Sequence, residues 1–234
     1  GTWTLNAANT YTGTTTITSG ILKLGNTSAL GTNATGTTIS SGGALDLNGY
    51  VLSSAEALTI SGTGVSSGGA LINTGAATSF SGDVTLGAAT TINTANDITL
   101  SGTISPNTYT LSKAGANSLI MGSNTVTING LTISAGTFNA GSSTINLSGT
   151  FTNSGTFTCG TGTVNFVGSA AQSIPALTYY NLTLNNTTSP STSAATLAGN
   201  ISVGGTLTLT TGILNTSTYT IDLGANGSIS ESNP

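Results

Sequence analysis

The chain repeats a short unit in which apolar and hydroxyl side chains alternate over four to six residues and then reach Gly, Asn or Ser. Clear examples are residues 43–49 (GALDLNG), 124–130 (NTVTING) and 206–212 (TLTLTTG). An alternation of period two is typical of a β-strand with one buried face, because successive side chains point to opposite sides. About one residue in five is Thr, which is β-branched and favours strands, whereas Glu, Lys, Gln and Arg are scarce or missing. The sequence therefore predicts an all-β fold.

The turn signals are too closely spaced for a β-sandwich or barrel. They recur about every 6 or 7 residues, whereas a sandwich or barrel shows them about every 8–12 residues. Three such units make a coil of about 20 residues, which lies in the range of solenoid repeats. We therefore predict one domain over residues 1–234, a right-handed parallel β-helix solenoid. It should have about 11–12 coils stacked about 4.8 Å apart, which makes a rod roughly 55 Å long.

A solenoid explains why only 3% of the residues are charged. In parallel coils each side chain lies directly over its counterpart in the next coil, so a charged residue at a repeated position would face its like. Ladders of Thr, Ser and Asn avoid this repulsion and can hydrogen-bond from coil to coil. Leu, Ile, Val and Phe then fill a narrow interior, and an apolar fraction of 36% distinguishes the chain from a disordered one.

The composition argues against several classes of function. The chain has no His and no Arg, and its basic residues are Lys23 and Lys113. Its six acids are scattered singly, at Asp46, Glu56, Asp83, Asp97, Asp222 and Glu231. General acid–base catalysis draws on His or on paired carboxylates, so we expect no enzyme, no catalytic residue and no cofactor. A net charge of −4 without a basic patch argues against nucleic-acid binding, and apolar runs such as residues 119–121 are too short for a membrane-spanning helix.

Four motifs in residues 1–49 carry a family resemblance. They are L-N-x-A-N-T-Y-T-G from Leu5 to Gly13, T-x-I-x-x-G-x-L-x-L-G from Thr15 to Gly25, S-A-L-G from Ser28 to Gly31, and G-G-A-L-D-L-N-G from Gly42 to Gly49. Together they resemble the autotransporter-associated β-strand repeat of the passenger regions of large exported bacterial proteins. Thr14 departs from the family, which usually has a second Gly there.

The last third resembles a different group. Val164–Leu184 and Thr206–Pro234 are similar to repeated stretches of very large surface or secreted proteins, notably from Bacteroidetes-like bacteria. Those stretches continue past the S-I-S-E element, so the resemblance implies that Pro234 is an interior point of a longer chain. Both resemblances imply export, a parallel β-helix and a role at the bacterial surface, and neither carries catalytic residues.

Three aromatic residues and the single Cys each have a functional interpretation beside a plainer structural one. Tyr179 and Tyr180, close to Pro175, could offer a stacking surface to a sugar, but one ring inside and one outside a strand is the simpler expectation. Trp3 could lie on a ligand surface, but we favour a residue that caps the open core of the first coil. Cys159 has no partner for an internal disulfide and no neighbouring charge to lower its thiol pKa. We expect it to be inert, with an intermolecular cross-link as the alternative.

Single carboxylates could bind calcium, since hard cations prefer oxygen ligands. The candidates are Asp46, Asp83, Asp97 and Asp222. None lies in a G-G-x-G-x-D array, and GALDLNG places Asp46 within an alternating strand, so no metal site is predicted. Asp83 and Asp97 are the two acids that a solenoid could bring closest together, so they are the nearest candidates for a catalytic pair.

Thr-x-Thr recurs along the chain, and a flat Thr array on a β-helix is a feature of some ice-binding proteins. The occurrences are Thr16/Thr18, Thr108/Thr110, Thr125/Thr127, Thr156/Thr158, Thr206/Thr208/Thr210 and Thr218/Thr220. A flat lattice needs one constant offset in successive coils, and these spacings are uneven, so we interpret the pairs as ladder packing.

The function that these observations favour is structural. We expect an extracellular rod, a filament-forming subunit or a stalk segment of a bacterial surface fibre or adhesin. Its partner would be itself, as a homopolymer or as neighbouring segments of one long chain, through end-to-end stacking of exposed strand edges. The first alternative is carbohydrate binding or cleavage, with a surface polysaccharide as partner, although a retaining glycosidase needs two carboxyl groups about 5–5.5 Å apart. The second alternative is ice binding by Thr ladders.

Overall fold

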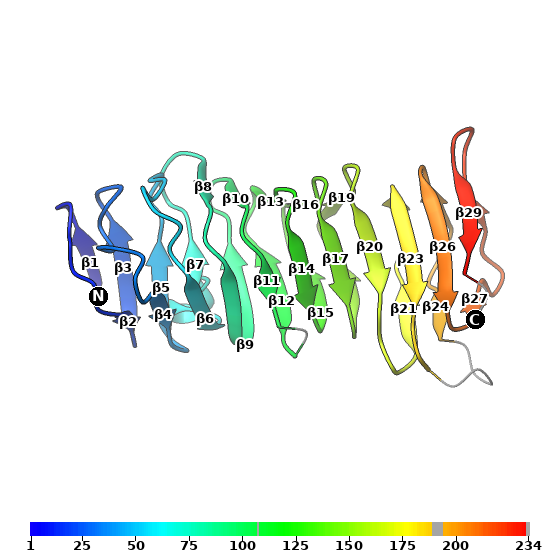
Figure 1. Ribbon diagram of the computed structural model, residues 1–234, viewed down its shortest axis with the longest axis horizontal. Coiled ribbons are helices and arrows are strands. Elements are labelled where there is room, and N and C mark those ends of the chain that lie inside the picture. Colours follow the sequence, from blue (N-terminus) through cyan, green and yellow to red (C-terminus); the bar gives the residue numbers. More distant parts are fainter. Residues whose placement is uncertain (107, 189–193, 233–234) are drawn as a thin grey trace.

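The structure, a computed structural model, describes residues 1–106, 108–188 and 194–232, and Pro234 lies outside this part of the chain. It shows an elongated all-β solenoid of about 11 turns (Figure 1). Strands of successive coils pair in parallel along the length of the rod. The predicted all-β parallel solenoid is confirmed, the number of coils agrees with the expected 11–12, and the right-handed winding stays a prediction.

One row of strands runs through the whole rod, and we call it the continuous face. It takes one strand from each coil: β2 (Thr15–Ile17), β4 (Thr37–Ile39), β6 (Leu58–Gly62), the first half of β9 (Val84–Asn93), β11 (Ile104–Ser105), β14 (Thr125–Ile128), β17 (Thr144–Leu147), β20 (Thr163–Phe166), β23 (Asn181–Asn185), β26 (Thr206–Thr211) and β29 (Ser228–Glu231).

Two further rows complete the coils, and we call them the second and third faces. The second face holds β1 (Thr2–Leu5), β3 (Gly20–Leu24), β5 (Gly43–Asp46), β7 (Leu71–Ile72), the second half of β9, β12 (Thr110–Ala114), β15 (Gly130–Ile133), β18 (Phe151–Asn153), β21 (Gln172–Ile174), β24 (Ala195–Leu197) and β27 (Leu214–Asn215). The third face holds β8 (Thr78–Phe80), β10 (Ile98–Leu100), β13 (Ser118–Met121), β16 (Thr137–Asn139), β19 (Thr156–Thr158), β22 (Thr178–Tyr179), β25 (Ile201–Val203) and β28 (Ile221–Asp222). A short 3-10 helix, η1 (Val65–Ser67), lies between β6 and β7.

The strands stay in register although the coils differ in length. Along the continuous face the register advances 18 residues from Val164 to Leu182 but 26 residues from Leu58 to Val84. Each of these four residues lies in the buried core. The corners and loops therefore absorb the difference in length, and the faces keep their alignment.

Alternation places apolar side chains inside and neutral polar side chains outside. Val126, Ile145 and Val164 follow one another along a buried column of the continuous face. In the outward column one residue further on, Asn146 Nδ2 donates to Thr127 Oγ1 at 3.3 Å, and Asn165 Nδ2 donates to Asn146 Oδ1 at 3.0 Å. These bonds are the polar ladder that the composition predicted.

Glycines with left-handed backbones make the tightest corners. Gly141 and Gly160 have φ values of 58° and 55° and stack in successive coils, where the N–H of Thr161 donates to the Gly141 carbonyl oxygen at 2.8 Å. A Cβ on Gly160 would clash with that same carbonyl oxygen. Only Gly fits this corner without strain.

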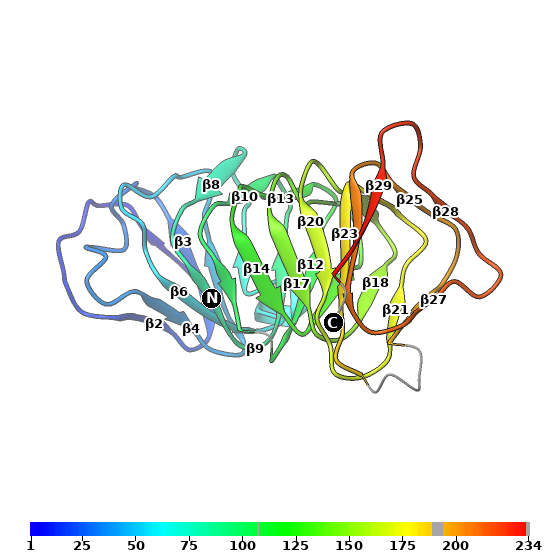
Figure 2. The ribbon, with the colours of Figure 1, turned by 45° about the vertical axis from the view of Figure 1, so that its right-hand side comes forward.

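The second and third faces are interrupted at the same place. β18 pairs with β15 and β19 with β16, whereas β21 and β22 begin new sheets with β24 and β25. Within the described residues no strand pairing joins the two sets, although the continuous face runs on from β17 through β20 to β23. We call the space between β18–β19 and β21–β22 the ladder gap. Figure 2 shows the last coils beyond it from the side, with β25 and β28 along one edge and β21 and β27 along another.

Candidate functional surfaces

Asp83 and Asp97 each brace the next coil. Asp83 Oδ1 accepts hydrogen bonds from the backbone N–H and the hydroxyl of Thr103, both at 2.8 Å, and Asp97 Oδ1 accepts from the N–H of Ser118 at 2.7 Å. The Thr103 hydroxyl, with the backbone N–H, holds the pKa of Asp83 below its usual value. Asp83 precedes a strand of the continuous face and Asp97 a strand of the third face. The two carboxylates therefore lie at separate corners of the solenoid and do not form a catalytic pair.

Asp46 is buried, and both oxygens of its carboxylate have polar partners. It lies in register with Lys23 of the preceding coil, and its Oδ2 is 3.3 Å from Lys23 Nζ. Thr74 donates its N–H to Oδ1 at 3.0 Å and its hydroxyl to Oδ2 at 2.6 Å. The place of Asp46 within an alternating strand was predicted, but its burial was not, because the loop that supplies Thr74 comes from a later part of the chain.

The other acids are also dispersed. Glu56 Oε1 accepts a hydrogen bond from the Thr37 hydroxyl at 2.7 Å, and burial raises the pKa of Glu56. Asp222 Oδ1 accepts from the N–H of Gly224 at 2.8 Å, and Glu231 is exposed on the last strand. Among the described residues no three His, Cys, Asp or Glu side chains gather as a metal-ion cluster.

Lys113 lies inside the solenoid, which the sequence analysis missed. It stands in an inward column between Ile92 and Ile133 and is fully buried. Its Nζ donates to the carbonyl oxygens of Ala114 at 2.8 Å, Gly115 at 2.9 Å and Ala135 at 3.0 Å. Burial lowers the pKa of Lys113 to about 8, and attraction to Asp97 opposes part of this shift. The missed signal is the alternation in T-L-S-K-A, which gives Lys113 the same orientation as the buried Leu111.

Tyr179 points into the core and Tyr180 points out, as predicted. Tyr179 is fully buried, whereas 40% of Tyr180 is exposed. The Tyr179 hydroxyl donates to the Pro175 carbonyl oxygen at 3.0 Å, and burial raises its pKa. The ring centroids of Tyr179 and Phe157 are 6.0 Å apart, and those of Phe157 and Phe138 are 6.3 Å apart. This inner aromatic stack continues across the ladder gap.

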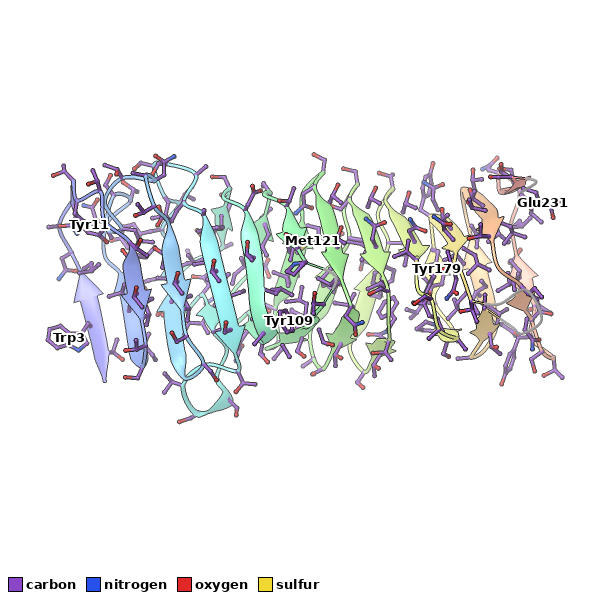
Figure 3. All side chains as sticks on the ribbon, turned by 60° about the horizontal axis from the view of Figure 1, so that its bottom comes forward. Trp3, Tyr11, Tyr109, Met121, Tyr179 and Glu231 are labelled. Atoms are coloured by element: carbon purple, nitrogen blue, oxygen red, sulfur yellow. The ribbon has the colours of Figure 1, made fainter. Side chains whose placement is uncertain are left out.

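The two tips of the rod leave core positions open. Trp3 lies at the end of an inward column with Leu22, and Ile229 lies at the end of another with Leu207. Trp3 is 78% exposed and Ile229 is 57% exposed. Figure 3 shows Trp3 at one end of the rod and Glu231 at the other. Trp3 therefore has the predicted position at the end of the core, but it borders the open core and does not seal it.

The Thr-x-Thr pairs fall on different faces. Thr125/Thr127 lies on the continuous face, Thr156/Thr158 on the third face, and Thr110 on the second. On the continuous face the column that does align is mixed, since Thr127 is followed by Asn146 and Asn165. The arrangement supports ladder packing.

Cys159 is half-buried beside β19, and burial raises the pKa of its thiol. A raised pKa keeps the thiol protonated and reduces its nucleophilicity. This agrees with an unreactive residue, and the intermolecular cross-link stays an untested alternative.

Within the described chain no helix has the length and apolarity to cross a membrane. The model of one known family, the passenger-associated-transport-repeat, matches residues 1–24. This match confirms the resemblance found at the start of the chain, and together with the β-solenoid it fits an autotransporter passenger domain. Searches of curated proteins and of solved structures gave no significant match.

Proposed function

We propose that the chain is a rod segment of an extracellular bacterial surface protein, with a mechanical and not a catalytic role. The continuous face carries this proposal. It passes through about 11 turns without a break, and every strand before β29 contributes a buried apolar position. At about 4.8 Å per coil this face spans about 50 Å. Extension along the rod pulls on the backbone hydrogen bonds between coils, and two coils separate only when all the bonds of their shared interface open together.

The neutral exterior suits a protein exposed outside the cell. The chain has two basic residues, and one of them, Lys113, is fully buried. Trypsin-like proteases cleave after Lys or Arg, so the folded rod exposes few cleavage sites to them. The passenger-associated-transport-repeat at residues 1–24 supports a secreted or surface location.

The open tips support end-to-end association with further solenoid coils. β1 pairs with β3 and β29 with β26, so each has one edge without a strand partner in the described chain. The exposed Trp3 and Ile229 lie at core positions of these two strands. Another coil would bury the apolar side chains and pair the free edges. The partner is a solenoid of the same type, either a second copy or neighbouring coils of a longer chain.

Electron microscopy and sedimentation velocity of the purified chain test this proposal. We expect rods whose lengths are multiples of about 50 Å and whose proportion rises with concentration. Ile229→Lys should leave single rods, because a charge at an open core position prevents stacking. Val51→Lys is the matched control, since Val51 is 49% exposed on the loop between β5 and β6 of an internal coil. Compact particles would contradict the rod, and identical association of both variants would contradict stacking through the tips.

A further inference from the structure

The ladder gap presents free strand edges on both of its walls. β18 and β19 bond to the preceding coil, and β21 and β22 bond to the following coil. The N–H of Ser154 donates to the Ile133 carbonyl oxygen at 2.8 Å, and on the other wall the N–H of Gln172 donates to the Ala194 carbonyl oxygen at 3.0 Å. Backbone groups alternate in direction along a strand. Phe151 and Asn153 on one wall, and Ser173 on the other, therefore direct their N–H and C=O groups into the gap.

The gap is held at its ends and open between them. Gln172 Nε2 donates to the carbonyl oxygens of Leu147 at 3.0 Å and Gly149 at 2.8 Å. The contact between the Phe157 and Tyr179 rings holds the other end. Between these points the side-chain oxygen of Asn153 is buried without a hydrogen-bond partner. A polar atom in this state is stabilised when a donor reaches it.

Two cavities follow one another along the gap. The larger, about 540 Å³, lies between residues 148–152 and 170–173. The smaller, about 410 Å³, is lined by residues 153, 155–157 and 176–178 and extends past β22 to residues 200 and 202 of the following coil. Both cavities open to the solvent, so an extended chain can approach the gap from outside. Neither cavity has a charged lining residue.

We propose that the ladder gap binds an extended, uncharged peptide strand, which pairs with the free edges of β18 and β21. This is β-augmentation inside a rod and is independent of stacking at the tips. The unpaired groups on both walls are backbone N–H and C=O groups, and another backbone carries the matching donors and acceptors at the same repeat along the strand. The preferred peptide should alternate apolar and hydroxyl side chains, because the neighbouring β15 has this pattern as Leu131, Thr132 and Ile133.

The test uses the 234-residue chain and the peptide Asn-Gly-Leu-Thr-Ile-Ser-Ala, which copies residues 129–135. Its control is the same peptide with alternate backbone nitrogens methylated, which cannot form the ladder. Hydrogen exchange followed by mass spectrometry should slow at least tenfold around residues 151–153 and 172–174 with the first peptide, and should not change with the methylated one. Protection confined to β1 or β29 would overturn the proposal. So would a neutral oligosaccharide that protects the gap residues more strongly than the peptide does.

A pair of variants tests the same site from the protein side. Thr152 and Ser173 have exposed side chains on the two walls, and a Lys at an edge strand opposes strand addition. T152K combined with S173K should weaken peptide binding at least tenfold. Thr132→Lys is the matched control, because Thr132 lies one coil earlier in an intact ladder. Circular dichroism must show that both proteins are folded, and equal affinity of the two would overturn the proposal.

Discussion

At the scale of single residues, the charged side chains serve as braces within the solenoid. Lys113 bonds to carbonyl oxygens of its own corner and of the next coil, at Ala114, Gly115 and Ala135. Three acceptors around one nitrogen suit an ammonium group, which has three donors. Desolvation nevertheless opposes the charge, so the pKa of Lys113 falls to about 8. The cost of keeping this charge inside should therefore decrease as the group loses its proton.

We predict that Lys113 makes the protein more stable as pH rises from about 8 to about 10.5. The folded pKa is about 8, below the ordinary value of 10.5. Between these values the unfolded chain binds a proton that the folded chain has released, so stability increases with pH. The expected gain is about 1–3 kcal/mol.

Chemical denaturation at pH 7.5 and pH 10 measures this gain, with Lys113→Met as the control that removes the titrating group. Tyr179 has a raised pKa, which acts in the opposite direction near pH 10, but it is present in both proteins and cancels in the comparison. Equal changes in wild type and K113M would show that the buried amine does not titrate in this range.

Alternation in the sequence predicts the direction of these side chains, but it does not predict the burial of one that points outward. T-L-S-K-A directs Lys113 inward with Leu111, and GALDLNG directs Asp46 outward, opposite to Leu45 and Leu47. Asp46 is buried all the same because Thr74, 28 residues later, closes over it. Contacts of this kind depend on loop length, which period-two patterns do not contain.

At the scale of strands, the polar ladders depend on register. Because the coil length varies between 18 and 26 residues, this register cannot be identified from the sequence. The predicted ladders of Thr, Ser and Asn are present, but their members could not be paired before the corners were known. Asn146 and Asn165 illustrate this, because their side chains bond although 19 residues separate them.

We predict that like charges in this ladder destabilise the solenoid. Asn146→Asp together with Asn165→Asp places two carboxylates in register, and the pair should lose about 0.5–1 kcal/mol more than the sum of the two single variants. The excess should vanish at pH 3, where the carboxylates take up protons. Denaturation of the double-mutant cycle measures it.

The control for this pair keeps one charge and reverses the other. N146D with N165K should show no excess loss, because opposite charges attract at the same spacing. If the two double variants were equally stable, repulsion between stacked charges would not explain the uncharged exterior of the rod.

At the scale of the whole molecule, each coil contacts only its neighbours, so stability is a sum of coils and of couplings between them. The coupling is weakest at the ladder gap, where two of the three faces lose their pairing. The continuous face, the Gln172 bonds and the contact between Phe157 and Tyr179 remain. The sequence does not predict this gap, because residues 148–156 have the same Gly, Ser, Thr and Asn composition as the other corners.

We predict that Phe157→Ala separates the rod into two cooperative blocks. Loss of the ring should remove about 3 kcal/mol of coupling, so the coils from β21 onward should exchange their amide hydrogens before those up to β18. Phe138→Ala is the matched control, since Phe138 belongs to the same aromatic stack but lies in an intact ladder. It should destabilise the first block without separating the second. Hydrogen exchange in increasing denaturant distinguishes these outcomes, and a single transition in the Phe157 variant would mean that the continuous face and the Gln172 bonds are enough to couple the coils across the gap.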